Sequence, residues 1–462
     1  MNILRWFDDG LSVADRQRIV RGTFHSFLIQ GFSVLLVFVS NLLLVRASDA
    51  ASYGLYVHVF NWVSILGVVV MGGRDDLVLA QLPRYAVGEP ARLVGLVRSV
   101  NRWILAAAVV VATLFVLLLQ GVRIGTLSDQ EGLFRIAMFA VYLTAAMGLN
   151  QLILQALNRV RLSQVIEKLV KPVLLIAGVG LLRLAAVTFN ARVLVILSSI
   201  VLAVCCVGLA WLVMRSVRAI AGRAAAVGEG SGAGEGAGAV AAKTWWFFLI
   251  SLFYLLSTKI TMLMLPAYLP VKEAAMKDIG IFNISYRFAD LLIFPFFLMH
   301  TVLPQLFARH ADSGRAYTQS LFSESNKLMT LLSLPLLVVV AAGGPLLLRL
   351  FGHDFAGGYI AMIYLSLAQF LFSVFGPANT ILMMQDRERW AAGCLFVFVA
   401  VLAGTSRWLI PAGGITGGAA AVLISSGVYN VLLAVVLYRV SGVVSPFFSW
   451  LVRRRSGLRR NG

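Results

Sequence analysis

The sequence predicts an all-α polytopic membrane protein with about 12 transmembrane helices, arranged as two parallel-repeat six-helix bundles around a central cavity. Of its 462 residues, 60% are hydrophobic and only 13% are charged, with a mean hydropathy of +0.88, whereas globular proteins average about 25% charged residues. Apolar stretches of spanning length, about 20 residues, recur along the whole chain. A glycine-rich run near the middle then divides the chain in two.

The spans define the expected domains. Residues 1–22 are polar and lack the apolar core of a signal peptide, so we expect a cytoplasmic segment, either an interfacial helix or a solvated tail. Residues 23–214 hold six helices centred near residues 35, 62, 112, 143, 178 and 202. Residues 244–440 hold six more, centred near 255, 292, 338, 369, 400 and 428. Residues 441–462 form a basic cytoplasmic tail.

Basic residues test this helix count, because cytoplasmic loops of membrane proteins carry an excess of Lys and Arg. With both termini cytoplasmic, the cytoplasmic segments hold 28 of the 39 Lys and Arg residues, the opposite side holds 7 and the spans hold four. Lys168 and Lys171 fall in the cytoplasmic loop before the fifth helix. Membrane topology therefore explains the net charge of +19, and no nucleic-acid partner is expected.

A Gly- and Ala-rich segment, residues 215–243, separates the two bundles. Gly-rich loops also cradle phosphates, but the nearest approach to a Walker pattern, Ala242-Lys243-Thr244, lacks the glycine before the lysine. A flexible cytoplasmic linker is the favoured interpretation.

The two bundles look internally related. Tyr53–Tyr56 at the start of the second helix matches Ile279–Phe282 at the start of the eighth, and the same ungapped alignment places Asn61 on Arg287. Because each bundle has an even number of spans, both keep one orientation. This predicts parallel repeats, with a substrate site between them near the membrane midplane.

Three charged residues, Lys259, Arg287 and Asp290, lie within the seventh and eighth spans. A charge at the bilayer centre costs about 2.5–3.5 kcal/mol even on lenient insertion scales, so such residues usually face a partner or a polar cavity. Arg287 and Asp290 are three residues apart and share one helix face with Asn283. Either Asp290 forms a buried pair that only fixes packing, or the cluster lines a pathway. Since one pair leaves one cation over, we favour an anionic ligand such as a phosphate.

Polar residues of the first two helices, and basic residues at their ends, complete the expected cavity. They are Asn41, His58, Asn61, Arg46 and Arg74. Fixing neighbouring helices together is the alternative role for each polar residue. An ordinary loop position is the alternative for each arginine.

Enzyme chemistry finds little support in the sequence. The five histidines have no metal-ligand spacing, no nucleophile motif stands out, and the expected outer loops are short. We expect no catalytic residue, no metal site and no cofactor. The three cysteines lie in apolar runs and predict no disulfide framework.

Several short motifs occur in the order and spacing of a known family. They are Arg21-Gly22, Tyr53-Gly54-Leu55-Tyr56, Gly280, Tyr286-Arg287, Pro304 and Leu350-Phe351-Gly352-His353-Asp354-Phe355. On these motifs the chain resembles the O-antigen and exopolysaccharide flippases of the multidrug/oligosaccharidyl-lipid/polysaccharide exporter superfamily. Arg287 matches a basic position common in that family's eighth helix. The element after the second helix, residues 71–76, is more charged than the family pattern, and the expected basic residue appears only at Arg84.

The resemblance implies two bundles forming a V around a cationic cavity in a bacterial inner membrane. It implies that an undecaprenyl-pyrophosphate-linked oligosaccharide crosses from the cytoplasmic to the periplasmic leaflet by alternating access, for lipopolysaccharide or exopolysaccharide biosynthesis. Coupling to a proton or sodium gradient, or to the membrane potential, is implied as well. The expected partners are the lipid-linked glycan, membrane lipids and other polysaccharide-assembly membrane proteins. Three alternatives stay open: a cation-coupled multidrug exporter of the same fold, a non-transporting scaffold for glycan synthesis, and a membrane glycosyltransferase or polymerase.

Overall fold

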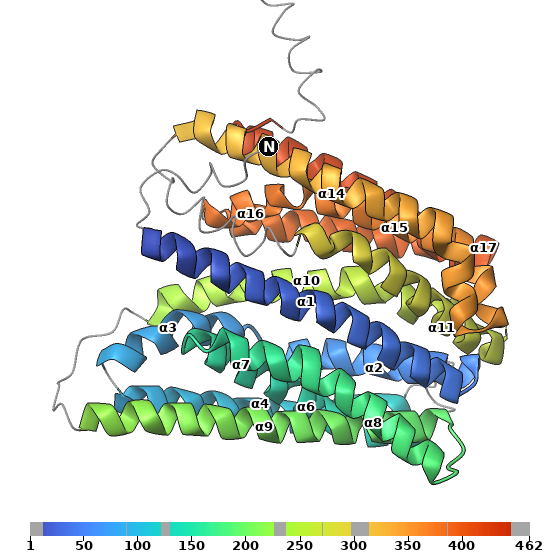
Figure 1. The fold of residues 1–462 in the computed structure, drawn as a ribbon, viewed down its shortest axis with the longest axis horizontal. Helices are drawn as coiled ribbons and strands as arrows, with labels where there is room; N and C mark the ends of the chain where they lie inside the picture. Colours follow the sequence, from blue (N-terminus) through green and yellow to red (C-terminus); the bar gives the residue numbers. More distant parts are fainter. Residues whose placement is uncertain are drawn as a thin grey trace, which may run out of the picture.

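The computed structural model describes residues 13–88, 90–121, 130–225, 237–269, 271–296, 314–385 and 387–444, and every regular element in these ranges is helical. Figure 1 shows long helices running side by side. The first half contains α1 (Val13–Ala47), α2 (Ala50–Met71), α3 (Arg74–Gly88), α4 (Pro90–Gly121), α6 (Glu131–Ala156), α7 (Val160–Val165), the π-helix η2 (Ile166–Val170), α8 (Lys171–Leu184) and α9 (Ala191–Ala225). The second half contains α10 (Ala237–Tyr268), α11 (Lys272–Ala289), η3 (Asp290–Ile293), α14 (Gly314–Phe351), η5 (His353–Gly358), α15 (Tyr359–Phe375), α16 (Pro377–Met384) and α17 (Glu388–Ser441).

Ten helices in the described ranges are long and apolar enough to cross a membrane. Two features account for the difference from 12. α8 has only 14 residues of its own, although it continues from α7 and η2 without a break, and α17 contains two of the expected helices. The eighth helix was expected near residue 292 but begins at Lys272. The charged residues of its first turns displaced the apolar window toward its end.

α17 is a pair of antiparallel helices that turn at Gly414, which has φ 54° and ψ −130°. The rings of Phe398 and Tyr429 lie 5.3 Å apart, and the hydroxyls of Thr405 and Ser425 lie 3.3 Å apart. A straight helix would separate residues 20 positions apart by about 30 Å. The chain therefore folds back on itself here and forms the eleventh and twelfth expected helices.

The two halves meet where α2 packs against α10 and α11. Figure 1 shows most helices of the first half on one side and those of the second half on the other, and one cluster of buried apolar side chains runs through both. At the crossing of α2 and α11, a Cβ on Gly54 would overlap the carbonyl oxygen of Met276 and lie 3.0 Å from the nitrogen of Gly280. Gly54 and Gly280 are equivalent in the alignment of the two halves. Contact between equivalent positions is the arrangement expected for two-fold-related repeats.

Helices extend into the segments expected to be terminal or linking. α1 begins at Val13, so residues 13–22 continue the first span, while residues 1–12 lie outside the described ranges. α9 reaches Ala225 and α10 begins at Ala237, so only residues 226–236 of the expected linker lie outside the description. Alanine and arginine, which are frequent at these ends, are strong helix formers. Pro304 and the basic tail from residue 445 also lie outside the described residues.

Candidate functional site

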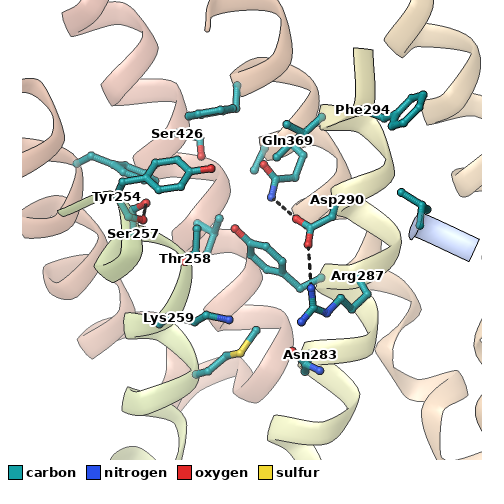
Figure 2. A pocket seen from close by; sticks show the side chains of 18 of the residues that line it. Tyr254, Ser257, Thr258, Lys259, Asn283, Arg287, Asp290, Phe294, Gln369 and Ser426 are labelled. Carbon is teal, nitrogen blue, oxygen red and sulfur yellow. Dashed lines mark hydrogen bonds and ion pairs between the residues drawn. The ribbon is translucent and has the colours of Figure 1, made fainter. Parts of the chain in front are cut away.

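A cavity of about 350 Å³ lies among α1, α10, α11, α15 and α17, and this volume falls within the usual range of ligand pockets, about 300–1,000 Å³. Its charged lining consists of Lys259, Arg287 and Asp290, and Asn283 lies beside them. Figure 2 shows Lys259 and Arg287 pointing into the same space from α10 and α11. The structure therefore brings together the charged cluster that the sequence singled out.

Arg287 and Asp290 form the ion pair that their spacing predicts, but it is a loose one. The Arg287 Nη1 to Asp290 Oδ2 distance is 3.9 Å, and the two side chains are 46% and 36% exposed. Gln369 Nε2 donates a closer hydrogen bond to Asp290 Oδ1, at 3.1 Å (Figure 2). A guanidinium carries five N–H donors, and within the described part of the chain this long pair is the only ion pair of Arg287. Arg287 is therefore placed to bind an anion in the cavity.

Asp290 lies where α11 changes into the 3₁₀-helix η3. A 3₁₀ stretch inside a longer helix often marks a hinge or a sequence under strain. The pair therefore stands at a point where the regular helix is already interrupted.

Lys259 supplies the second cation of the cavity and forms no ion pair among the described residues. Near it, the hydroxyls of Ser257 and Thr258 donate back to helix carbonyls of α10, at 2.6 and 2.8 Å. Their oxygens remain able to accept hydrogen bonds from a ligand. Two cations, one carboxylate and several hydroxyl or amide groups make this lining suited to an anionic, hydroxyl-bearing molecule.

A second cavity, of about 140 Å³, adjoins the first at Arg287 and Asp290. It lies between α1 and α11, and most of its lining is apolar. Its lining residues are Ser33, Val34, Val37, Phe38, Asn41, Ile284, Arg287, Phe288, Asp290, Leu291 and Phe351. Polar and apolar compartments thus meet at the Arg287–Asp290 pair.

Asn41, at the edge of the second cavity, belongs to a hydrogen-bond chain that joins three helices. Tyr53 Oη donates to Asn41 Oδ1 at 2.9 Å, and Asn283 Nδ2 donates to Tyr53 Oη at 2.9 Å. The chain connects α1, α2 and α11 beside the Gly54–Gly280 crossing. Tyr53, which is completely buried, was recognised in the sequence only as part of a motif.

Two of the predicted polar residues pack between helices, outside the lining of both cavities. Asn61 Nδ2 donates to Met262 Sδ at 3.3 Å, which joins α2 to α10. His58 is buried, with its ring 6.1 Å from that of Phe134 in α6. Both positions match the helix-packing alternative, and a role in ligand binding stays a prediction for each.

The two predicted arginines at the helix ends also lie outside the two linings. Arg46 Nε donates to the carbonyl oxygen of Leu350 at 2.8 Å, and the carbonyl of Arg46 accepts from Arg183 Nη2 at 2.8 Å. Arg74 stacks its guanidinium 3.5 Å from the centre of the Trp103 ring. A place for Arg46 and Arg74 on the substrate pathway remains a prediction.

Two candidate residues were not predicted from the sequence: Gln369, which lines the larger cavity, and Lys168, which contacts a residue of that lining. Gln369 is the one amide side chain in the otherwise mostly apolar helix α15, and a polar residue in such a helix could have indicated a polar contact there. Lys168 donates to Oε1 of Gln30, which lines the larger cavity, although its charge had assigned it to a loop. In the described ranges, no group of three or more His, Cys, Asp or Glu residues could hold a metal ion.

No protein-family model matches the chain, and no curated protein matches its sequence. Its fold is nevertheless similar to that of solved structures. An outward-facing MATE family multidrug resistance transporter of the MOP superfamily matches with a TM-score of 0.61 and 13% identity over 96% of each chain. The lipid II flippase MurJ, in an inward closed conformation, matches with a TM-score of 0.64 and 11% identity over 89% of this chain and 86% of that one. The MATE multidrug transporter DinF-BH matches with a TM-score of 0.63 and 17% identity over 94% of this chain and 97% of that one.

The protein is therefore an all-helical, multi-pass membrane protein, and its fold is similar to that of these MOP-superfamily proteins. This confirms the predicted fold class. The narrower resemblance to polysaccharide flippases stays a prediction, because structural similarity at these identities shows the fold alone.

Proposed function

We propose that the protein is a flippase that moves a polyprenyl-pyrophosphate-linked oligosaccharide from the cytoplasmic to the periplasmic leaflet of a bacterial inner membrane. It acts by alternating access in the biosynthesis of a cell-surface polysaccharide, and it is not an enzyme. The observation that carries the proposal is the cationic excess of the larger cavity, where Lys259 and Arg287 face one carboxylate, Asp290.

The chemistry of flipping explains why this excess matters. A phosphate-bearing headgroup crosses the bilayer only if fixed groups replace its water, because an unpaired charge in an apolar medium is very costly. Lys and Arg replace that water through charge-assisted hydrogen bonds to phosphate oxygens. Ser257, Thr258 and Gln369 offer hydroxyl and amide groups to the sugars.

The apolar cavity beside Arg287 supports the lipid part of the proposal. Its lining of Val34, Phe38, Phe288 and Leu291 suits a hydrocarbon chain. A headgroup bound at Arg287 would therefore have an apolar surface next to it, between α1 and α11. A lipid-linked substrate needs both surfaces together.

The same lining argues against the rival functions. An exporter of cationic drugs needs an acidic or aromatic cavity, and although Tyr254 and Phe372 are present, the net charge of this lining is positive. A glycosyltransferase or polymerase is disfavoured because the outer loops expected from the sequence are too short to build an extramembrane active site. A non-transporting scaffold has no use for cations in a cavity, so it predicts that Lys259→Gln and Arg287→Gln leave function intact.

The decisive experiment follows a polyprenyl-pyrophosphate-linked sugar between leaflets of vesicles that contain the purified protein. We expect Arg287→Gln to slow this movement at least tenfold relative to wild type at matched insertion. Arg135→Gln is the control, because Arg135 pairs with Glu131 on an exposed helix face. Equal movement in wild type and Arg287→Gln would refute Arg287 as a substrate-binding residue but leave the flippase function supported. No movement in wild type under an imposed ion gradient and potential would favour a drug exporter or a scaffold.

A further inference from the structure

In the first half of the chain, the continuous helix from Val160 to Leu184 is interrupted by a π-helical segment. α7, η2 and α8 hold 6, 5 and 14 residues and follow one another without a break, and η2 is a π-helix. π-helical turns are rare and occur frequently at functional sites. Lys168 lies within this π-helix and Lys171 directly follows it.

Both lysines lie well inside this helix rather than in a loop. The combined helix is about 38 Å long at about 1.5 Å per residue, and Lys171 lies roughly 17 Å from its start. This corrects the sequence-based placement in a cytoplasmic loop. The charges at Arg159, Arg161 and Glu167 lower the local hydropathy, so the sequence did not predict that the helix begins as early as Val160. If this helix spans the membrane as expected, a lysine within it needs a polar cavity or a partner.

The contacts of the two lysines show which way they face. η2 and α8 pack against α1, and Lys168 donates to Oε1 of Gln30, a residue of α1 that lines the larger cavity. Lys171 begins α8 directly after this π-helix, one helical turn beyond Lys168, and α8 packs against the same helix α1. Within the described ranges, the side chain of Lys171 donates no hydrogen bond. The first half of the chain thus places Lys168 against a residue that lines the larger cavity, with Lys171 one helical turn away on the same helix.

We propose that Lys168 and Lys171 form one half of a diphosphate-binding cradle, of which Lys259 and Arg287 form the other half. The proposal rests on the proposed function and adds to it the residues of the first half that bind the diphosphate and a preference for diphosphate over monophosphate. Four cations, offset by the carboxylates of Asp290 and Glu167, leave two positive charges. This balance matches the two ionised phosphoryl groups of a diphosphate diester.

A cradle divided between the halves has a mechanical consequence. A ligand shifts a conformational equilibrium only through contacts that differ between the two states. A diphosphate that binds Lys171 on one side and Arg287 on the other draws the halves together around the headgroup. A monophosphate neutralises the cations of one half and leaves the cations of the other half without a counter-charge. The cradle should therefore bind diphosphate more tightly than monophosphate.

The test measures binding to the full-length protein in nanodiscs. The probes are a polyprenyl-diphosphate-linked sugar, the matching polyprenyl monophosphate, and inorganic pyrophosphate. We expect the combined change Lys168→Gln with Lys171→Gln to weaken binding of the diphosphate lipid about 10- to 100-fold, because it removes hydrogen bonds to a charged group. The ratio of diphosphate to monophosphate affinity should also fall toward one.

Three further variants separate binding from folding. Lys171→Arg keeps the charge and should retain most of the affinity. Glu167→Gln removes an exposed offsetting carboxylate and should tighten diphosphate binding several-fold, which tests the cradle even if the glutamine variants of the lysines fail to fold. Lys327→Gln is the matched control, because Lys327 is exposed and pairs only with Glu324 among the described residues. Lys327→Gln should leave the affinities for all three probes unchanged.

The outcomes distinguish the cradle from the proposed function. Wild-type affinity in the double lysine variant, together with lost binding in Arg287→Gln, would overturn the cradle and leave the flippase standing. Binding of inorganic pyrophosphate but of no lipid probe, with the same dependence on the lysines, would support the cradle and overturn the lipid substrate. Absence of binding of every probe to wild type would overturn both.

Discussion

Gly54 and Gly280, at equivalent positions of the two halves, pack against each other where α2 crosses α11. A Cβ on Gly280 would lie 2.9 Å from the carbonyl oxygen of Ala50, and a Cβ on Gly54 would overlap that of Met276. The crossing lies near the starts of both helices, while Arg287 lies near the end of α11. In the predicted orientation, this contact lies toward the outer side of the membrane, and the alternating access that we propose requires it to open.

Replacing Gly54 by alanine should separate the halves at this end, because the added Cβ has no space. Overpacking typically costs about 1–3 kcal/mol, and here the strain acts only on the closed arrangement. Spin labels at positions 48 and 273, in a background without the three native cysteines, should report longer distances by electron paramagnetic resonance. Gly95→Ala, where a Cβ meets open space, is the control. An unchanged distance distribution in Gly54→Ala would show that this contact does not close the protein.

Tyr53→Phe should weaken the same closed arrangement by removing one oxygen. The hydroxyl of Tyr53 accepts from Asn283 and donates to Asn41, so its loss leaves two amides without that partner. Interhelical polar contacts in membranes contribute about 1 kcal/mol, which predicts roughly a fivefold shift toward the separated population. Tyr56→Phe is the matched variant, because its hydroxyl accepts only from Ser198 in the described ranges. Equal effects of the two changes would refute a special role for the hydrogen-bond chain.

Asp290→Asn should remove a dependence of ligand binding on pH or sodium. Protonation of Asp290, or sodium binding to it, removes the negative charge beside Arg287 and frees the guanidinium for phosphate. Diphosphate-lipid binding by wild type should therefore tighten as pH falls, while Asp290→Asn should bind tightly throughout. Lys259, Tyr254 and Tyr286 also face this cavity, so the comparison is between the pH slopes of the two proteins. The asparagine keeps the Oδ1 acceptor for Gln369, and matching slopes would exclude Asp290 as the coupling group.

Gly414→Ala should destabilise the turn within α17. With φ 54° and ψ −130°, the backbone there adopts a conformation that only glycine enters readily, and such strain costs about 1–3 kcal/mol. Gly413→Ala is a close control, because it makes the same substitution in the neighbouring residue, also in open space and without a positive φ. We expect a lower midpoint of thermal unfolding for Gly414→Ala alone. Equal midpoints would mean that the turn relaxes at little cost.

Much of the fold was predictable because membrane insertion depends on local composition. The spans near residues 35, 62 and 143 were expected from hydropathy and lie within α1, α2 and α6. The Arg287–Asp290 pair was predictable as well, since residues three apart on a helix share a face. The same hydropathy argument failed at the start of α11 and at the start of the α7–α8 helix, where the first turns are charged. Hydropathy is averaged over a window of residues, so a charged helical turn is predicted as a loop.

The sequence by itself determined the membrane class and the cationic character of the seventh and eighth helices, and it predicts a division into two related halves. Only the tertiary structure decided which polar residues face a cavity. Asn61 and Arg287 align in the two repeats, yet Asn61 bonds to Met262 between helices while Arg287 lines the cavity. Lys168 is likewise a candidate because η2 packs against α1, where Lys168 donates to Gln30. The reason is physical: local sequence fixes which face of a helix is polar, but distant packing partners fix where that face points.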